Sequence, residues 1–402
     1  MPVFLNINGV WTEVQTPTVN VNGSWVDLTK IMVNVSGAWL NVWEANASIP
    51  QDYYIVQPND TALSIKRALL SIKEYSTLIF EVGEWVLTEP IVINRSNITI
   101  MGTSKLSKLT RSSDFGENGL INVTGDDDKK LTNVRIFGFH LDGQFNQTNK
   151  TGYGILVDRV GISPTEGSIG EGKDINSWGN QVTNSFGVVI EDCIISNNSF
   201  NGIKLTKTSI SQLINNSIIN NNLSGLTLNS TMNLRILSNK VNNNANDGVN
   251  LQNSYQTIIG YNNVESNRGS GISLNNCKGN TLNDNSLTLN TNSGLIVDGS
   301  IGNVIQGNFI DINGSCGIDL VNSSRNSFVS NNVNSNRDGM ILNSSSLNSI
   351  VSNVVVNNSN NGVIMLSNSE NNLCLSNVLS LNAIKNLVDN GSFNIMDNNF
   401  TN

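Results

Sequence analysis

The sequence is poor in the residue types on which several functions depend. It contains a single histidine, His140, which excludes a metal site built from several histidines. It has 23 Lys and Arg against 31 Asp and Glu, a formal net charge of −8, which argues against nucleic acid as a partner. No apolar run is long enough for a transmembrane helix, and the first residues lack the basic start and apolar core of a signal peptide. We therefore expect no metal, no cofactor, no nucleic-acid partner, no membrane insertion and no signal-directed secretion.

What the sequence does contain is a repeat, which runs from Ser185 to Asn402. A glycine recurs every 23 residues, with one step of 22. Its members are Gly202, Gly225, Gly248, Gly271, Gly294, Gly317, Gly339 and Gly362. One asparagine row runs from Asn198 to Asn382 with nearly the same step, and a second row runs from Asn216 to Asn353. Self-similarity at a fixed step of this length predicts a solenoid.

The pattern inside each repeat predicts the kind of solenoid. Each unit holds three short runs in which apolar residues alternate with polar ones, separated by Asn, Ser and Gly, which is typical of strands and turns. No segment of the repeat has helical spacing. Three strands per coil, stacked in register, give an all-β parallel β-helix in which like residues lie about 4.8 Å apart. An inward asparagine such as Asn267 would then bond the next coil and satisfy buried turn amides.

The repeat resembles the right-handed parallel β-helix superfamily of pectate lyases and phage tailspikes, over roughly residues 50–402. The resemblance implies the fold, whereas the same coils carry many activities or none.

The four cysteines, Cys193, Cys277, Cys316 and Cys374, fall at different places in the repeat and therefore do not stack in pairs. We expect them to be free thiols.

Residues 1–44 hold a different repeat, with the unit Gly-x-Trp every 14 residues. Asn8-Gly9 and Asn22-Gly23 between alternating apolar runs predict a small β meander of three hairpins. Trp11, Trp25 and Trp39 form its core or, alternatively, anchor it to a partner. The hairpins resemble modules near the ends of phage tail and head proteins, which implies an attachment domain. Residues 45–59 are expected to be a linker.

Residues 60–402 are predicted to form the β-helix domain. Ile65, Ala68, Leu69 and Ile72 have helical spacing, which predicts an amphipathic helix over 61–74 with Asp60 as its N-cap. A helix followed by short strands is similar to the start of pectate-lyase-like tailspike domains, and we expect it to cover the open end of the first coil.

A segment of about 25 residues, 158–184, interrupts the coils and is predicted to be an inserted loop. It is rich in glycine and carries Glu171, Asp174 and Trp178. Long loops on rigid scaffolds are common sites of function, so these three residues are candidate ligand-binding residues. The alternative is that the loop folds over the solenoid wall as a local plug.

Catalysis remains open in the sequence. Asp298 and Asp319 lie one coil apart on the outward side of the glycine-led strands, at a backbone separation of roughly 8 Å. Two carboxylates at such a separation are what a glycosidase needs, but scattered surface carboxylates meet the same test. Asp142-Gly143 is interpreted as a turn, with a catalytic Asp142 as the alternative.

We therefore interpret the chain as a virion appendage protein, such as a tail fibre, tailspike or head fibre, that projects a rigid β-helix for host-surface recognition. By analogy with tailspikes it would be a homotrimer, bound through residues 1–44 to other virion proteins and facing host glycans. Two alternatives remain: a tailspike depolymerase, which would be a glycan hydrolase or lyase, and a cell-surface adhesin.

Overall fold

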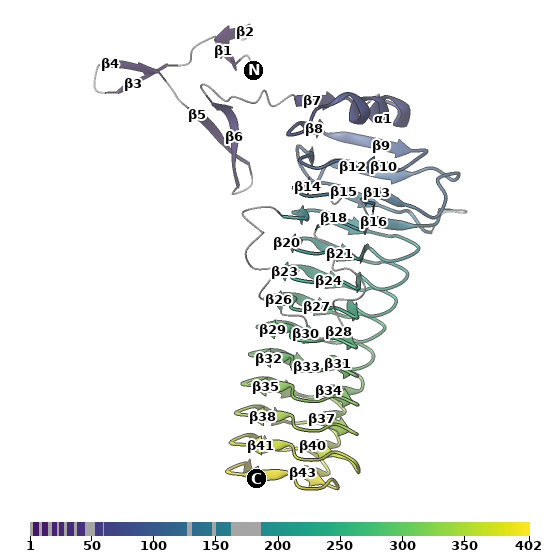
Figure 1. The fold of residues 1–402 in the computed structure, drawn as a ribbon, viewed down its shortest axis with the longest axis vertical. Coiled ribbons are helices and arrows are strands. Elements are labelled where there is room, and N and C mark those ends of the chain that lie inside the picture. Colours follow the sequence, from purple (N-terminus) through teal and green to yellow (C-terminus); the bar gives the residue numbers. More distant parts are fainter. Residues whose placement is uncertain are drawn as a thin grey trace.

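A computed structural model of the protein shows a stack of coils built from three parallel sheets (Figure 1). The structure describes residues 53–58, 60–126, 131–146, 150–161 and 186–402, and the backbone of six strands between residues 3 and 44. The stack has about 14 turns. The predicted fold class, a right-handed parallel β-helix with coils of about 23 residues, is confirmed.

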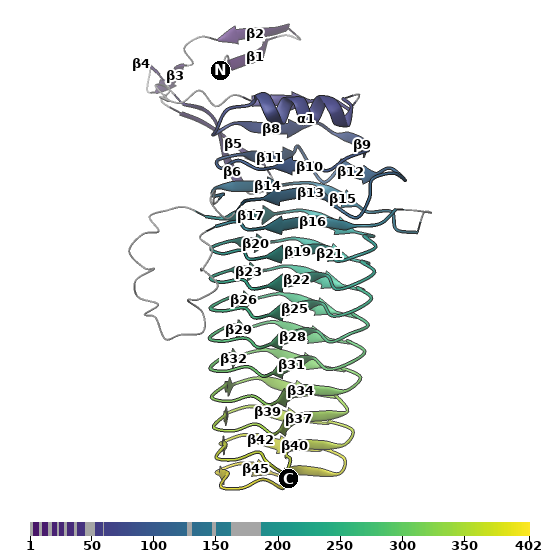
Figure 2. The ribbon, with the colours of Figure 1, turned by 45° about the vertical axis from the view of Figure 1, so that its right-hand side comes forward.

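Each sheet contains one strand from each coil, so that two strands paired within a sheet lie one coil apart in the chain (Figure 2). Sheet I has 14 strands: β7 Tyr53–Val56, β8 Thr77–Phe80, β11 Thr99–Gly102, β14 Val134–Phe137, β17 Val188–Glu191, β20 Gln212–Ile214, β23 Arg235–Leu237, β26 Ile258–Gly260, β29 Thr281–Asn283, β32 Val304–Gln306, β35 Ser327–Val329, β38 Ser349–Val351, β41 Leu373–Leu375 and β44 Ile395–Asp397. Sheet II has 13 strands: β9 Gly83–Leu87, β12 Ser107–Arg111, β15 His140–Asp142, β18 Ile194–Ser196, β21 Ser217–Ile219, β24 Lys240–Asn242, β27 Asn263–Glu265, β30 Ser286–Thr288, β33 Phe309–Asp311, β36 Asn332–Asn334, β39 Val354–Val356, β42 Val378–Ser380 and β45 Phe400–Thr401. Sheet III has 12 strands: β10 Ile91–Ile93, β13 Gly119–Thr124, β16 Tyr153–Asp158, β19 Ile203–Thr206, β22 Leu226–Asn229, β25 Val249–Gln252, β28 Ile272–Asn275, β31 Leu295–Asp298, β34 Cys316–Val321, β37 Asp338–Asn343, β40 Asn361–Met365 and β43 Lys385–Asp389.

The core of the stack is a set of apolar columns. Alternate residues of each strand point inward, so one column in sheet I includes Leu213, Ile236 and Ile259, all fully buried. The buried apolar residues form one cluster that extends from Val56 to Leu379. The described solenoid therefore contains its own continuous core.

The predicted helix is present as α1, Ala62–Ser71, at the N-terminal end of the stack (Figure 2). Ile65, Ala68 and Leu69 are buried and belong to the core cluster, so the helix covers the first coil as expected. The predicted N-cap was wrong by one residue. Thr61 is the N-cap and forms a capping box with Ser64, whereas Asp60 accepts a hydrogen bond from the backbone of Gln57.

The segment predicted as a linker, 45–59, is structured in part. Residues 53–56 form β7, which pairs in parallel with β8 and is the outermost strand of sheet I. The pairing extends the backbone hydrogen bonding of the first full coil by one strand. The solenoid therefore begins before α1, and the sequence pattern missed β7 because it precedes the helix and lies outside the repeat.

The asparagine rows are ladders inside the stack. Asn267 is fully buried, and its Nδ2 donates to the backbone oxygen of Val241 at 3.0 Å and to Oδ1 of Asn290 at 3.0 Å. Its Oδ1 accepts from the backbone nitrogen of Asn244 at 3.0 Å. A third ladder, which the sequence pattern did not reveal, links Asn280, Asn303, Asn326, Asn348, Asn372 and Asn394. The ladders satisfy buried turn groups that would otherwise cost stability.

The first residues form three separate hairpins rather than one meander sheet. The pairs are β1 Val3–Ile7 with β2 Val10–Val14, β3 Thr18–Val21 with β4 Ser24–Asp27, and β5 Lys30–Val35 with β6 Ala38–Glu44. In each hairpin the Trp of the Gly-x-Trp unit is paired with an Asn across the strands: Asn6 with Trp11, Asn20 with Trp25, and Asn34 with Trp39. The side chains of these tryptophans lie outside the described part of the structure, so their core and docking roles remain predictions.

All four cysteines are free and buried, as predicted. Burial raises the pKa of Cys193 and of Cys374 to about 12, and that of Cys277 and of Cys316 to about 11. Such thiols stay protonated near neutral pH and are poor nucleophiles. They therefore act as small packing residues. Cys193, for example, occupies the first place of the second asparagine column, where its backbone nitrogen donates to Asn216 Oδ1.

Candidate functional site

The residues predicted in the inserted loop, Glu171, Asp174 and Trp178, lie outside the described residues. The structure describes the strands on either side of the insertion, β16 and β17, which end and begin at Asp158 and Val188. The ligand-binding role of these three residues therefore stays a prediction.

Asp298 and Asp319 lie on the outward face of sheet III, on neighbouring strands. The register pairs Ile296 with Asp319 and Asp298 with Val321, so the two carboxylates are diagonal neighbours. Burial, and then the charge of Asp298, raise the pKa of Asp319 above its ordinary value. Apolar residues flank Asp319 along its column, Ile296 on one side and Ile341 on the other. A catalytic role for this pair stays a prediction.

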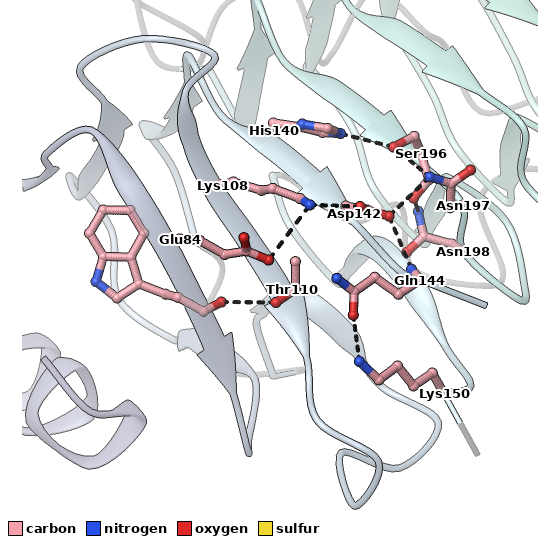
Figure 3. A network of polar contacts seen from close by, with 11 residues as sticks. Glu84, Lys108, Thr110, His140, Asp142, Gln144, Lys150, Ser196, Asn197 and Asn198 are labelled. Atoms are coloured by element: carbon pink, nitrogen blue, oxygen red, sulfur yellow. Dashed lines mark hydrogen bonds and ion pairs between the residues drawn. The ribbon is translucent and has the colours of Figure 1, made fainter. Parts of the chain in front are cut away.

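A second group of charged and polar residues gathers on the outward face of sheet II, near the N-terminal end (Figure 3). Its strands are β9, β12, β15 and β18, which pair in that order. One column of this face consists of Glu84, Lys108, His140 and Ile194, and the next outward column contains Thr110, Asp142 and Ser196. We call Glu84, Lys108, His140, Asp142 and Ser196 the sheet II cluster.

Lys108 and Asp142 form the charged centre of the sheet II cluster. Lys108 Nζ lies 3.0 Å from Asp142 Oδ2 and 3.6 Å from Glu84 Oε1 (Figure 3). Burial acts to lower the pKa of Lys108, but the hydrogen bond and charge of Asp142 and the charge of Glu84 outweigh it and raise that pKa. Burial acts to raise the pKa of Asp142, but hydrogen bonds from Asn197, Lys108 and the backbone of Gln144 lower it. Both groups are therefore ionised at neutral pH.

Asp142 is also the residue that closes the strand. Its Oδ1 accepts from the backbone nitrogen of Gln144 at 3.1 Å and from Asn197 Nδ2 at 3.0 Å. The turn expected at Asp142-Gly143 is thus present after β15. The same side chain, however, is only 12% exposed and holds Lys108, so Asp142 belongs to the cluster as well as to the turn.

His140 supplies a neutral partner beside these charges. Its Nε2 lies 3.0 Å from Ser196 Oγ. Burial lowers the pKa of His140, the charge of Asp142 opposes this shift and the charge of Lys108 adds to it. A histidine that is neutral at pH 7 can accept a proton, and Lys108 can place positive charge next to it. The cluster therefore contains the parts of a proton-transfer site.

A buried arginine lies at the inner side of the same coils. Arg111 is fully buried, and its Nη2 donates to Asn198 Oδ1 at 3.0 Å, the first oxygen of the first asparagine ladder. Its Nη1 donates to the backbone oxygen of Thr151. Burial lowers the pKa of Arg111 to about 10, against the opposing charge of Asp142, so it remains a cation at neutral pH. Arg111 therefore ties the early coils to the regular ladder.

The sequence pattern missed the sheet II cluster because its coils are irregular. Lys108, His140 and Ile194 stack in space, yet they are separated by 32 and then 54 residues in the chain. A search at a fixed step cannot align them. The only signal was the chemistry of the segment itself, in which the single histidine stands two residues before Asp142.

Comparison with known proteins gives the family. The family model described as the right-handed beta helix region matches residues 118–300 and 224–379, which together span more than half of the chain. No curated protein matches the sequence.

Several solved structures share the fold. The A-module of the mannuronan C-5 epimerase AlgE6 from Azotobacter vinelandii has a TM-score of 0.68 at 14% identity, over 86% of this chain and 96% of that chain. The periplasmic alginate epimerase AlgG has a TM-score of 0.57 at 14% identity, over 85% and 83%. The Dettilon tailspike protein has a TM-score of 0.54 at 15% identity, over 86% and 66%.

At such low identity these structures share the architecture with this chain, and that architecture serves both a phage tailspike and enzymes that act on polysaccharides. Together with the family-model match over most of the coils, the observed stack places the chain in the right-handed β-helix family.

Proposed function

We propose that the chain is a structural appendage protein of a virus particle, of the tail fibre, tailspike or head fibre kind. The observation that carries the proposal is the continuous stack of coils, whose regular part is held together by the asparagine ladder from Asn198 to Asn386. Such a stack is a stiff rod, because each coil is bonded to the next on three sides. A stiff rod suits a protein that holds a recognition surface away from a particle.

The three hairpins supply the mount in this proposal. In each hairpin the Trp of the Gly-x-Trp unit pairs with an Asn at the same place in the register, and such a repeated aromatic suits attachment to a larger symmetric body. Other virion proteins are the partners of this mount, and three copies of the chain form the working assembly. The β-helix then faces the polysaccharides of the host envelope.

Removal of the mount tests the proposal. A variant without residues 1–45 keeps β7, α1 and the whole core cluster, so we expect a soluble, β-rich protein. That variant should no longer join the particle. Particles that carry the truncated chain at normal copy number would contradict the attachment role of the hairpins, and an image of the particle that shows no such chain would contradict the appendage role.

A second candidate function is a polysaccharide-modifying enzyme, of the hydrolase or lyase class, on sheet II. The observation that favours it is the placement of His140, held neutral by burial, in the same column as Lys108 and 3.0 Å from Ser196. A neutral histidine can take a proton from a sugar carbon or from water, and the adjacent lysine can stabilise the negative charge that develops.

Two variants separate this candidate from the first. If the chain cleaves or alters a host-type polysaccharide, His140→Ala and Lys108→Met should each abolish the reaction. Lys240→Met removes an exposed lysine from the same face of sheet II, several coils away, and should not change it. Turnover of the polymer that survives in His140→Ala would exclude the cluster as its catalyst.

A further inference from the structure

A groove lies on the outside of the solenoid at the corner that leads into sheet I, apart from the sheet II cluster. Its volume is about 380 Å³, and it crosses three successive coils at β20, β23 and β26, which lie next to one another in Figures 1 and 2. The lining side chains used below are Phe186, Gln212, Asn233, Arg235, Gln256 and Ile258. The volume falls within the range of pockets that hold small ligands.

Four polar side chains of the groove are not used by the described fold. Arg235 and Asn233 are exposed, and Gln212 and Gln256 are half-buried. Within the described structure, the side chains of these four residues form no hydrogen bond or ion pair. These amides and the guanidinium are therefore available to hydrogen-bond a ligand in the groove.

The charge of the groove is opposite to that of the whole protein. Among the described residues that line it, Arg235 is the one charged residue and none is a carboxylate. The chain as a whole carries a net charge of −8 and repels anions. Any attraction of an anion to this groove therefore comes from Arg235, because the net negative charge of the protein opposes it. A guanidinium fits a carboxylate or a sulfate group with two parallel hydrogen bonds.

The apolar groups give the groove a shape for a ring. Phe186 is 43% exposed, and its backbone is fixed by a hydrogen bond from its nitrogen to Asn133 Oδ1 at 3.1 Å. Ile258 is 38% exposed and follows Arg235 in the same column of sheet I. An aromatic face at one end, amides between and a cation in the middle are suited to a sugar, which has both C–H faces and hydroxyl groups.

We propose that this groove binds an anionic saccharide, with its carboxylate or sulfate group on Arg235, a sugar face against Phe186 and hydroxyl groups on Gln212, Asn233 and Gln256. The three coils span about 10 Å along the stack, so the site accepts a short stretch of a longer polymer that runs parallel to the solenoid axis. The inference deepens the proposed function, on which its biological meaning rests, because it names the class of host polysaccharide that the rod recognises.

Binding to the isolated full-length chain tests the site independently of any particle. The probes are a short oligogalacturonate, which is carboxylated, a short sulfated dextran, and a maltooligosaccharide, which is neutral. We expect the chain to bind at least one of the two anionic probes and not the neutral one, with an affinity that falls as salt is added. Preference between the two anionic probes distinguishes the carboxylate from the sulfate.

Matched variants locate the site. Arg235→Gln should weaken the binding by about tenfold or more, as expected for a lost hydrogen bond to a charged group. Phe186→Ala should weaken it as well. Arg268→Gln removes the same charge from another exposed corner, after β27, and should leave the affinity unchanged. Equal losses in Arg235→Gln and Arg268→Gln would mean general charge attraction and would overturn the proposal, as would the absence of binding to both anionic probes.

The outcome is separable from that of the proposed function. Particles that carry Arg235→Gln and still attach to host cells as well as the wild type would exclude the groove as the recognition site, while the appendage role would stand. Conversely, a chain that binds oligogalacturonate but is not found in any particle would keep the site and exclude the appendage role.

Discussion

Asn244 and Asn267 lie on consecutive coils, and a single oxygen atom of Asn267 accepts two hydrogen bonds from Asn244. The Oδ1 of Asn267 accepts two hydrogen bonds from Asn244, one from its Nδ2 at 2.9 Å and one from its backbone nitrogen at 3.0 Å. The same arrangement recurs along the whole column, for example between Asn290 and Asn313. Each amide oxygen thus satisfies a side chain and a turn of the preceding coil, so the loss of one asparagine leaves two donors without a partner.

We expect Asn267→Leu to destabilise the protein. The buried donors of Asn244 lose their acceptor, and the oxygen of Val241 loses a donor, at a cost of about 1–3 kcal/mol for each unsatisfied group. The melting temperature of the variant should fall clearly. Asn263→Leu changes an exposed, outward asparagine of β27 and is the control, with a much smaller effect. A melting temperature that does not fall in Asn267→Leu would count against the ladder.

The stability of the protein should decrease as the pH falls below neutral. Burial lowers the pKa of His140 below its ordinary value of 6.5, so the unfolded chain binds a proton that the folded chain does not. Stability is therefore lost as the pH falls through 6.5 towards the folded value. His140 is the only histidine, so His140→Asn should flatten the melting temperature between about pH 5 and 7. An equal slope in wild type and variant would contradict the shift.

Asp319→Asn should stabilise the protein at neutral pH. Burial and Asp298 raise the pKa of Asp319 in the folded state, so the folded chain holds its proton more firmly than the unfolded chain. The stability that comes from this proton is lost as the pH rises above the ordinary value of 3.8, and a neutral amide avoids that loss. The melting temperature of the variant should exceed that of the wild type at pH 7, and the difference should shrink near pH 3.

The same carboxylates allow a test of catalysis on sheet III. Because scattered carboxylates often lie this close without acting as an acid–base pair, we predict that the double variant Asp298→Asn with Asp319→Asn keeps glycan binding and any glycan turnover unchanged. Measured cleavage that disappears in the double variant would make sheet III a catalytic face.

The buried cysteines should resist a thiol reagent in the native protein. Burial raises the pKa of Cys193 to about 12 and that of Cys277 to about 11, so little thiolate is present at pH 8. We expect almost no reaction with a thiol-specific dye under native conditions and reaction of all four cysteines in denaturant. Rapid native labelling of any one of them would show that its coil opens.

The regular coils could be predicted closely because each position of the repeat has one environment. Gly202 and Gly225 stand where a side chain would meet the next coil, at 2.5 Å from Ile218 Cγ2 and from Val241 Cγ1, respectively. Glycine is therefore required at the same position of each of these coils, which makes the 23-residue step visible in the sequence. The inward columns and the two asparagine rows follow from the same cause.

The irregular parts could not be predicted in the same way. The third ladder begins only at Asn280, because Thr257 and Ser211 occupy the same column in earlier coils. Asparagine therefore recurs at this position in only about half of the coils, and the sequence shows no complete row. Thr61 is the N-cap instead of Asp60 because its side chain and Ser64 bond each other's backbone, a choice that depends on the local path of the chain. The sheet II cluster depends on coils of unequal length, so only the folded backbone brings Lys108 and Asp142 together.

The first asparagine ladder gives the solenoid a dipole along its axis. Every amide in it has its oxygen towards the preceding coil and its nitrogen towards the next, as for Asn221 and Asn244, so the small dipoles add along the axis and polarise one another. The negative pole lies at Asn198 Oδ1, and Arg111 places a buried cation against it. The ladder is therefore polar, with a cation bound at its negative end. A second stack whose coils run in the opposite direction could not extend the ladder, because its amides would point the wrong way.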